Sequence, residues 1–152
     1  MDDITEFKSA EYSWLSNMEY CTIFYRGILF NSVEGYYQAM KFNDKATALS
    51  ISKMNPYKAR EFGKSQKITN TNFEKLKLRI MRHGLMLKFS QEPFKSKLLE
   101  TGDRNICEGN WWGDDYWGVD IKTGIGDNHL GKLIMQIRQN LKVKEYEQYQ
   151  SN

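Results

Sequence analysis

The stretch Asn31 to Phe42, NSVEGYYQAMKF, predicts the helix around which the rest of the chain is organised. Asn31 is expected to cap this helix, because an asparagine side chain can accept a hydrogen bond from a free N–H group of the first turn. Glu34 then falls at the third helical position, where it would be the reciprocal member of a capping box. Most of the other side chains are apolar or aromatic, so we expect the helix to be largely buried.

Three polar side chains share one face of this predicted helix. Glu34, Gln38 and Lys41 are spaced i, i+4 and i+7, which places them in one row. On a buried helix such a row is expected to face a pocket. The alternative is that Glu34 is only a capping carboxylate and Lys41 only a solvated cation.

Size and composition indicate one globular domain. A chain of 152 residues fits a single domain, which we expect to cover residues 1–152, with a polar tail from about residue 142. Aromatic residues make up 14% and charged residues 27% of the chain, which excludes the disordered class. The net charge of +3 suits phosphorylated ligands but is small for a dedicated nucleic-acid-binding protein.

No targeting or membrane segment is visible. The N-terminus is acidic and lacks the apolar part of a secretion signal, and no run approaches the roughly 20 apolar residues of a membrane span. The two cysteines, Cys21 and Cys107, could form a bridge but are more simply interpreted as reduced thiols. We therefore expect a soluble cytoplasmic protein that does not contact membranes; its oligomeric state is left open.

The remaining patterns predict more helix than strand. Residues 21–30, CTIFYRGILF, predict a β-hairpin that turns at Arg26-Gly27. Cap signals and apolar periodicity predict further helices at residues 45–53, from Pro56 to Gly63, at 73–89, from Pro93 to Thr101, and from about Asn128 to Leu141. Residues 4–8 and 106–108 could add short strands. We expect an α+β fold, a mainly helical single domain with a small antiparallel β-sheet.

Residues 109–126 are dense in Gly, Trp and Asp and have neither helical nor strand periodicity, which is typical of a binding loop. Large aromatic rings can stack on flat heterocycles, and carboxylates can activate water or stabilise positive charge. The alternative is that the tryptophans fill the core and the aspartates make turns. The side chains concerned are Trp111, Trp112, Asp114, Asp115, Tyr116, Trp117 and Asp120.

A glycine-containing turn precedes the last predicted helix. Gly124 and Gly126 do not complete a dinucleotide fingerprint, because the third glycine, Gly131, comes too late. Free N–H groups at a helix start can nevertheless bind an anion, and Asn128 could add a side-chain donor. The alternative is a turn that simply needs glycine.

Metal and triad chemistry are not indicated. His83 and His129 are far apart and lack a second ligand at a metal-binding spacing. There is no Gly-x-Ser-x-Gly elbow, and neither cysteine has a recognisable histidine partner. We expect neither a metal nor a cofactor.

Four motifs follow one another along the chain: LSN (15–17), SVEGYYQAMKF (32–42), DDYWG (114–118) and GDNHLGKLIMQIR (126–138). In this order they resemble the YbiA-like proteins, also called the NADAR family, and the match runs from about residue 7 to 141. The resemblance implies an N-glycosidase, which cleaves the bond between C1′ of a ribose and a nitrogen. Some members act on phosphoribosylamino-pyrimidine intermediates of riboflavin synthesis and release ribose 5-phosphate, and others remove ADP-ribose from guanine bases in nucleic acid.

The resemblance also assigns residues. The family's functional glutamate falls on Glu34, and its aspartate and tryptophan fall on Asp114 and Trp117. A family tryptophan with an expected stacking role falls on Phe73, which is a smaller ring. Trp112, with Trp111 before it, replaces small or polar residues of the family and is expected to reshape the base pocket, and Gly35 stands where the family often has histidine.

The implied reaction passes through an oxocarbenium-like state, with positive charge spread over C1′ and the ring oxygen. We expect Glu34 to activate the attacking water and Asp114 to position the substrate or protonate the leaving nitrogen; which carboxylate does which stays open. Trp117 would stack on the leaving base or line the ribose. Lys41 would bind phosphate or attack C1′ as an amine.

Further substrate contacts are expected from Asn17, Gln38, Arg60, Phe73, Trp112, Gly126 and Asn128. We expect Glu34 and Asp114 to converge beside Trp117 on one sugar-sized cleft. The preferred substrate is a phosphoribosylamino-pyrimidine, since the modest charge favours a small molecule over a duplex. The alternatives are removal of ADP-ribose from guanine in nucleic acid, a non-catalytic module that binds ADP-ribose or an NAD derivative, and a structural interaction domain.

Overall fold

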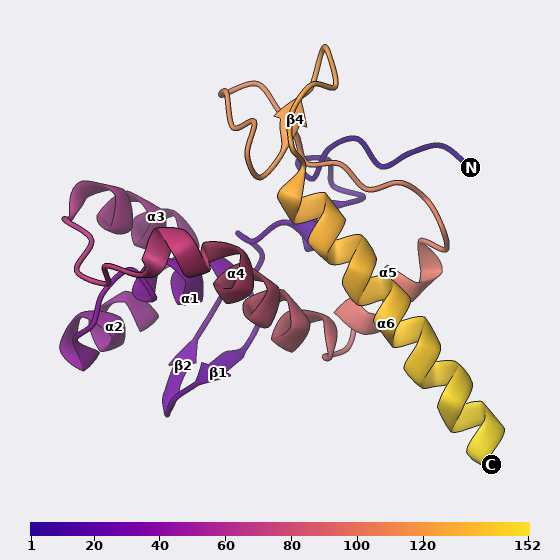
Figure 1. Cartoon of the computed structure of the whole chain (residues 1–152), viewed down its shortest axis with the longest axis horizontal. Coiled ribbons are helices and arrows are strands. Elements are labelled where there is room, and N and C mark those ends of the chain that lie inside the picture. Colours follow the sequence, from indigo (N-terminus) through magenta and orange to yellow (C-terminus); the bar gives the residue numbers. More distant parts are fainter. The chain divides into compact units, whose positions relative to one another are not determined.

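The computed structural model describes residues 1–152 and is mainly helical (Figure 1), which confirms the expected fold class. The chain divides into two compact units: Leu15–Lys88 is one, and Met1–Trp14 with Phe89–Asn152 is the other. Their order along the chain is a 3-10 turn at Ser13–Leu15, β1 (Ile23–Tyr25), β2 (Ile28–Phe30), α1 (Val33–Ala39), α2 (Lys45–Ser52), α3 (Pro56–Ser65), α4 (Phe73–Phe89), α5 (Phe94–Glu100), β3 (Gly109–Asn110), β4 (Val119–Asp120) and α6 (His129–Ser151).

The predicted hairpin is present in the first unit. Strands β1 and β2 pair antiparallel, with Phe24 opposite Leu29. Arg26 and Gly27 both have positive φ, 49° and 79°, as a two-residue turn between twisted strands requires. Because side chains alternate along a strand, the Phe24–Leu29 pair faces solvent while the neighbouring pairs face α1 and the core.

Helix α1 is the buried centre of this unit, and all seven of its residues are buried. It packs against α2, α3 and the hairpin. The predicted cap was wrong by one residue: the Ser32 hydroxyl accepts the Gly35 N–H at 2.9 Å, so Glu34 is not at the capping-box position. The Asn31 amide instead donates to the Met54 carbonyl at 3.1 Å.

The short length of α1 changes the expected polar row. The helix ends at Ala39, so Lys41 lies beyond it, in a turn. The Lys41 carbonyl accepts N–H groups from Thr69 at 3.1 Å and Asn70 at 2.9 Å, which fixes this turn against the segment before α4. Glu34 and Gln38 therefore share a helical face, and Lys41 is held near them by a loop contact.

Helices α2 to α4 follow their predicted positions, with two corrections. Asp44 caps α2 and Asn55 caps α3, each through a side-chain oxygen. Helix α3 does not end at Gly63 but continues to Ser65, because Gly63 has a packing role inside the helix. Helix α2 ends at Ser52, one residue before the predicted end.

The second unit contains a parallel pair of short strands that the sequence did not predict. Gly109 pairs with Val119, and Asn110 with Asp120. Only Ile4 of the expected strand at residues 4–8 pairs, in a single parallel bridge to Ile106. The loop of residues 111–118 is thus closed at its base by β3 and β4.

Helix α6, the orange-to-yellow helix of Figure 1, packs against α5 and buries Leu130, Leu133, Ile134 and Ile137, which recur at helical spacing. Leu141, the next apolar residue at this spacing, is half-buried. The helix was expected to end near Leu141, before a polar tail, but it continues to Ser151, since residues 142–150 contain no Gly or Pro and several good helix formers. None of the helices has the length and apolar character needed to span a bilayer.

Candidate functional site

Glu34 is a buried carboxylate on α1 with a defined orientation. Glu34 is only 8% exposed, and its Oε1 accepts a hydrogen bond from Gln38 Nε2 at 2.8 Å. Burial raises the pKa of Glu34 above its ordinary value, while the Gln38 hydrogen bond and the positive charges of Arg60, Lys41 and Lys64 oppose that rise. A carboxylate balanced in this way is suited to take a proton from water.

Gln38 completes this carboxylate–amide pair. The residue is 3% exposed, and its Oε1 has no hydrogen-bond partner. It lies against Gly63 of α3, where any side chain would collide with its amide. The sequence-based expectation was a substrate contact, and the structure shows that Gln38 first of all orients Glu34.

Lys41 lies close to the same pair. Its Nζ is 5.9 Å from the ring centroid of Tyr37 and 5.6 Å from that of Phe73. Burial lowers the pKa of Lys41, and the Glu34 charge partly offsets this effect. A lowered pKa increases the neutral fraction of an amine, so Lys41 retains both expected roles, as a phosphate ligand and as a nucleophile.

Helix α3 supplies two further cations. Arg60 and Lys64 are one turn apart, and both act electrostatically on Glu34. Arg60 was predicted as a substrate contact, whereas Lys64 was missed. The i, i+4 spacing of Lys64 from Arg60 was the signal available in the sequence. Together with Lys41 they place three positive charges within electrostatic reach of one carboxylate.

Asn17 and Glu34 are joined by a backbone hydrogen bond. The Asn17 carbonyl accepts the Glu34 N–H at 3.2 Å. Its side-chain Nδ2 lies 3.4 Å from the sulfur of Met81, and its Oδ1 is buried without a partner. The predicted substrate contact stays a prediction, and the unpartnered Oδ1 is the atom that could make it.

Phe73 is 2% exposed and packs its ring on Tyr37 with 5.2 Å between centroids. In this arrangement the ring supports Tyr37 and Lys41 and presents almost no surface of its own. Stacking of Phe73 on a substrate base therefore stays a prediction that would require the ring to become exposed.

Asp114 and Trp117 lie in the loop of the second unit, and Asp114 has a structural task there. Its Oδ1 accepts the N–H groups of Tyr116 at 3.2 Å and Trp117 at 2.9 Å. Asn110, 1% exposed, fixes the other side of the loop by exchanging two hydrogen bonds with the Asp114 backbone, at 2.8 and 3.0 Å. The aspartate thus makes a turn, as the structural alternative held, and orients Trp117 as well.

The start of α6 is not the free anion site that the sequence suggested. The N–H groups of residues 127–130 all donate to carbonyl oxygens of residues 115–118, at 2.7 to 3.1 Å. The Asn128 side chain accepts the Glu108 N–H and donates to the Ile106 carbonyl. Gly126 is needed because a Cβ would collide with the Gly118 carbonyl. The anion-binding expectation for this turn was therefore wrong, because the loop itself caps the helix.

Trp111 and Trp112 form an exposed aromatic pair. They are 63% and 47% exposed and meet edge to face with 5.1 Å between ring centroids. The Lys8 ammonium lies 4.8 and 4.6 Å from the two centroids, within cation–π range. The pair therefore does not fill the core, and Trp112 remains available for the predicted contact with a base.

The candidate residues fall into two groups. Asn17, Glu34, Gln38, Lys41, Arg60 and Phe73 belong to Leu15–Lys88, whereas Trp112, Asp114, Trp117, Gly126 and Asn128 belong to the other unit. The expected convergence of Glu34 and Asp114 on one cleft stays a prediction. No cluster of three or more His, Cys, Asp or Glu side chains has the arrangement of a metal site, and both cysteines are free.

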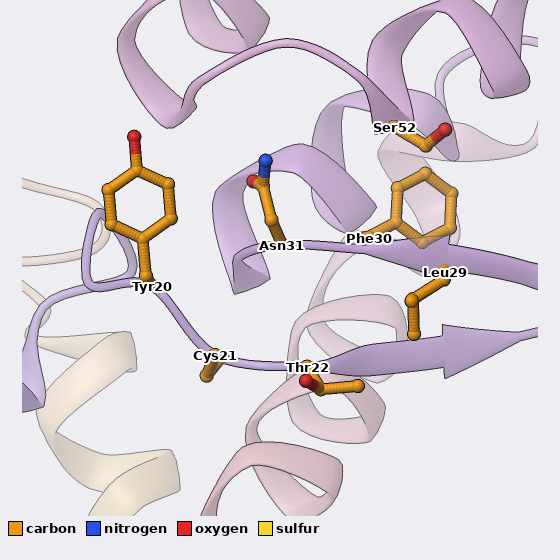
Figure 2. Close-up of a pocket in the computed structure, with 7 residues that line it drawn as sticks. All are labelled: Tyr20, Cys21, Thr22, Leu29, Phe30, Asn31 and Ser52. Atoms are coloured by element: carbon orange, nitrogen blue, oxygen red, sulfur yellow. The ribbon is translucent and has the colours of Figure 1, made fainter.

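A cavity of about 450 Å³ opens beside the hairpin, and Figure 2 shows the side chains around it. None of the predicted site residues lines this cavity. The aromatic and aliphatic walls come from the hairpin region and the polar groups from the segments around it. The lining residues are Tyr20, Cys21, Thr22, Leu29, Phe30, Asn31 and Ser52.

Comparisons with known proteins agree on one group. Residues 5–142 match the NADAR domain. The N-glycosidase YbiA of Escherichia coli strain K12 is 32% identical over 149 residues, which cover 95% of this chain and 92% of that protein. An N-glycosidase of Nostoc punctiforme is 31% identical over 86% of both chains.

Two further comparisons concern the pathway and the fold. A riboflavin biosynthesis protein of Vibrio vulnificus is 31% identical over 86% of this chain, although the match covers only 36% of that longer protein. The NMR structure of E. coli YbiA superposes with a TM-score of 0.84 at 32% identity and covers 97% of this chain and 89% of that one.

Proposed function

The chain belongs to the NADAR family of YbiA-like N-glycosidases, and from this premise we propose that it hydrolyses the C1′–N bond of a phosphoribosylamino-pyrimidine intermediate of riboflavin biosynthesis. Water adds its oxygen to C1′ of the ribose, the C1′–N bond breaks, and the nitrogen leaves with a proton. The products are ribose 5-phosphate and the aminopyrimidine. The riboflavin biosynthesis protein of V. vulnificus, similar over 86% of this chain, supports this choice of pathway.

The observation that carries the proposal is the environment of Glu34. A buried carboxylate, hydrogen-bonded at 2.8 Å to a buried amide, lies within electrostatic reach of Lys41, Arg60 and Lys64. A negative carboxylate stabilises the positive charge that develops at C1′ and can accept the proton of the attacking water. The cations fit a substrate that carries a phosphate group. A module that only binds its ligand has no need for a buried base.

The proposed roles of the other residues follow from their chemistry. Asp114 positions the substrate or protonates the leaving nitrogen, and Trp117 stacks on the pyrimidine. Lys41 holds the phosphate, or its amine bonds to C1′ as the C1′–N bond to the pyrimidine breaks, and water then displaces the lysine nitrogen from C1′. These roles require Glu34 and Asp114 to act on one substrate molecule.

A second candidate substrate is an ADP-ribosylated guanine in nucleic acid. It is favoured by the exposed Trp111–Trp112 pair with Lys8 beside it, because aromatic rings and a cation together can receive bases and phosphates of a single strand. The acidic side chains of the same loop and the net charge of only +3 favour the phosphoribosylamino-pyrimidine as the substrate instead.

Incubating the purified protein with each substrate in parallel tests the proposal. Chromatography of the products should show ribose 5-phosphate and free aminopyrimidine from the first substrate, and no ADP-ribose from an ADP-ribosylated guanine oligonucleotide. Release of ADP-ribose alone would make the second candidate correct. Binding of either compound in calorimetry without any product would identify a non-catalytic module and overturn the enzyme assignment.

A further inference from the structure

Gly63 occupies an unusual place for a glycine. It is buried inside α3, two residues before the helix ends at Ser65, where alanine would be intrinsically more favourable. Its backbone has no need for positive φ, because it is not among the positive-φ glycines. A Cβ built on it would overlap the side-chain amide of Gln38, with Oε1 and Cδ as the nearest atoms. The missing side chain leaves the space that this amide fills.

The Gln38 amide is held by one hydrogen bond and by the shape of the space around it. Nε2 donates to Glu34 Oε1 at 2.8 Å, and Oε1 is buried without a partner. No second hydrogen bond therefore fixes the amide plane. Its position depends on the shape of the space between α1 and α3, which Gly63 sets.

We infer that Gly63 is a positioning residue: by leaving room for the Gln38 amide, it holds that amide against the Glu34 carboxylate and so orients the base. The inference rests on the proposed function in that it takes Glu34 as the base of the reaction. A side chain at position 63 would push the amide away and release the carboxylate to other rotamers. Gly63 would then affect the chemistry without touching the substrate.

The surroundings of Glu34 define the direction in which its pKa changes when the Gln38 hydrogen bond is lost. Burial raises the pKa of Glu34, and the Gln38 hydrogen bond is the strongest influence that lowers it, followed by Arg60, Lys41 and Lys64. Helix α2 and the hairpin also pack on α1 but contribute no charge to this balance. Losing the Gln38 bond leaves burial less opposed, so the pKa of Glu34 rises.

A carbon NMR titration of glutamate side-chain carboxyl groups tests this directly. The Glu34 signal is assigned by its loss in Glu34→Gln. Gly63→Ala and Gln38→Leu should both raise the pKa of Glu34. Gly84→Ala is the matched control, because Gly84 is also a buried helical glycine facing α1, but its Cβ would meet the Tyr36 ring, at 2.8 Å, and not Gln38. It should lower the melting temperature and leave the Glu34 pKa unchanged.

Two double variants make the test decisive. Gly63→Ala added to Gln38→Leu should give no further rise in the Glu34 pKa, since the bond is already absent. Should Gly63→Ala alone not fold, Gly63→Ala combined with Gln38→Ala should fold again, because the overlapping amide is gone and only the Cβ atom of residue 38 remains, 3.2 Å away. A wild-type Glu34 pKa in folded Gly63→Ala, or a double alanine variant that also fails to fold, would overturn the inference. Since the titration needs no substrate, absence of turnover would refute the proposed function alone.

Discussion

The Oδ1 atom of Asp114 accepts the backbone N–H of Trp117 at 2.9 Å, so the aspartate that is expected to act in the reaction also shapes the loop that carries the tryptophan. Any substitution of Asp114 therefore changes two things unless it preserves the acceptor. Asparagine does preserve it, because its side-chain oxygen occupies the same place while the charge and the acid–base function are lost.

Asp114→Asn should keep the fold and lose activity. We expect a melting temperature close to that of the wild type and a rate lower by roughly 10²–10⁴, the usual contribution of a general acid or base. Asp114→Ala should in addition lower the free energy of unfolding by about 1–3 kcal/mol, because two N–H groups lose their acceptor. Equal reaction rates for Asp114→Asn and the wild type would show that Asp114 only makes the turn. Thermal denaturation and product chromatography provide both readouts.

Removing the charge of Glu34 should stabilise the protein. Because burial raises the pKa of Glu34 above its unfolded value, the folded state binds this proton more tightly, and stability is lost as pH rises through the folded pKa. Glu34→Gln should therefore have a higher free energy of unfolding than the wild type at pH 7, with a difference that shrinks towards pH 4. Urea denaturation across this range checks the sign, and a variant less stable at pH 7 would contradict it.

Lys88 should make the free energy of unfolding increase with pH under mildly alkaline conditions. This lysine is 0% exposed, its Nζ donates to the Ser16 carbonyl at 2.8 Å, and burial lowers its pKa to about 8. Between that value and the ordinary lysine pKa the unfolded chain binds more protons than the folded one, so stability increases with pH.

Lys88→Met removes the titrating group and is the comparison. The free energy of unfolding of the wild type minus that of Lys88→Met should rise from pH 7.5 to pH 10 by an amount on the order of 3 kcal/mol. A flat difference for Lys88→Met would mean that Lys88 is not desolvated as described.

Lys41 should reveal whether the reaction has a covalent step. Its lowered pKa and its place near Glu34 allow the amine to attack C1′. Borohydride added during turnover should then leave a reduced sugar adduct on the wild type, detected by mass spectrometry, and none on Lys41→Arg. Turnover without any adduct, together with weaker substrate binding by Lys41→Arg, would assign Lys41 to the phosphate instead.

The sequence predicted those parts of the fold that depend on neighbours along the chain. The hairpin turn at Arg26-Gly27 and the helix start at Pro56 follow from local chemistry, and the structure has them. Gly63 was misjudged as a helix end because the reason for it, the amide of Gln38, lies on another helix. A glycine after a helical stretch looks the same in sequence whether it stops the helix or receives a neighbour.

In the candidate site, too, relations between neighbours along the chain were predictable and contacts between distant segments were not. The spacing of Glu34 and Gln38 predicted that they share one helical face, and the structure joins them there by a hydrogen bond. The occupied N-terminus of α6 was not foreseeable, because the carbonyl groups that close it belong to a loop without periodicity. The sequence could place Asn128 at the helix start, but only the fold shows that its side chain bonds to residues 106 and 108.

The most direct test of the account is the single-turnover rate of ribose 5-phosphate release from the phosphoribosylamino-pyrimidine by the wild type and by Glu34→Gln, measured at pH 7.5 with binding checked by calorimetry. Glutamine keeps the shape and loses the base, so the variant should bind the substrate and release product roughly 10²–10⁴-fold more slowly. A variant that releases ribose 5-phosphate at the wild-type rate would contradict the account.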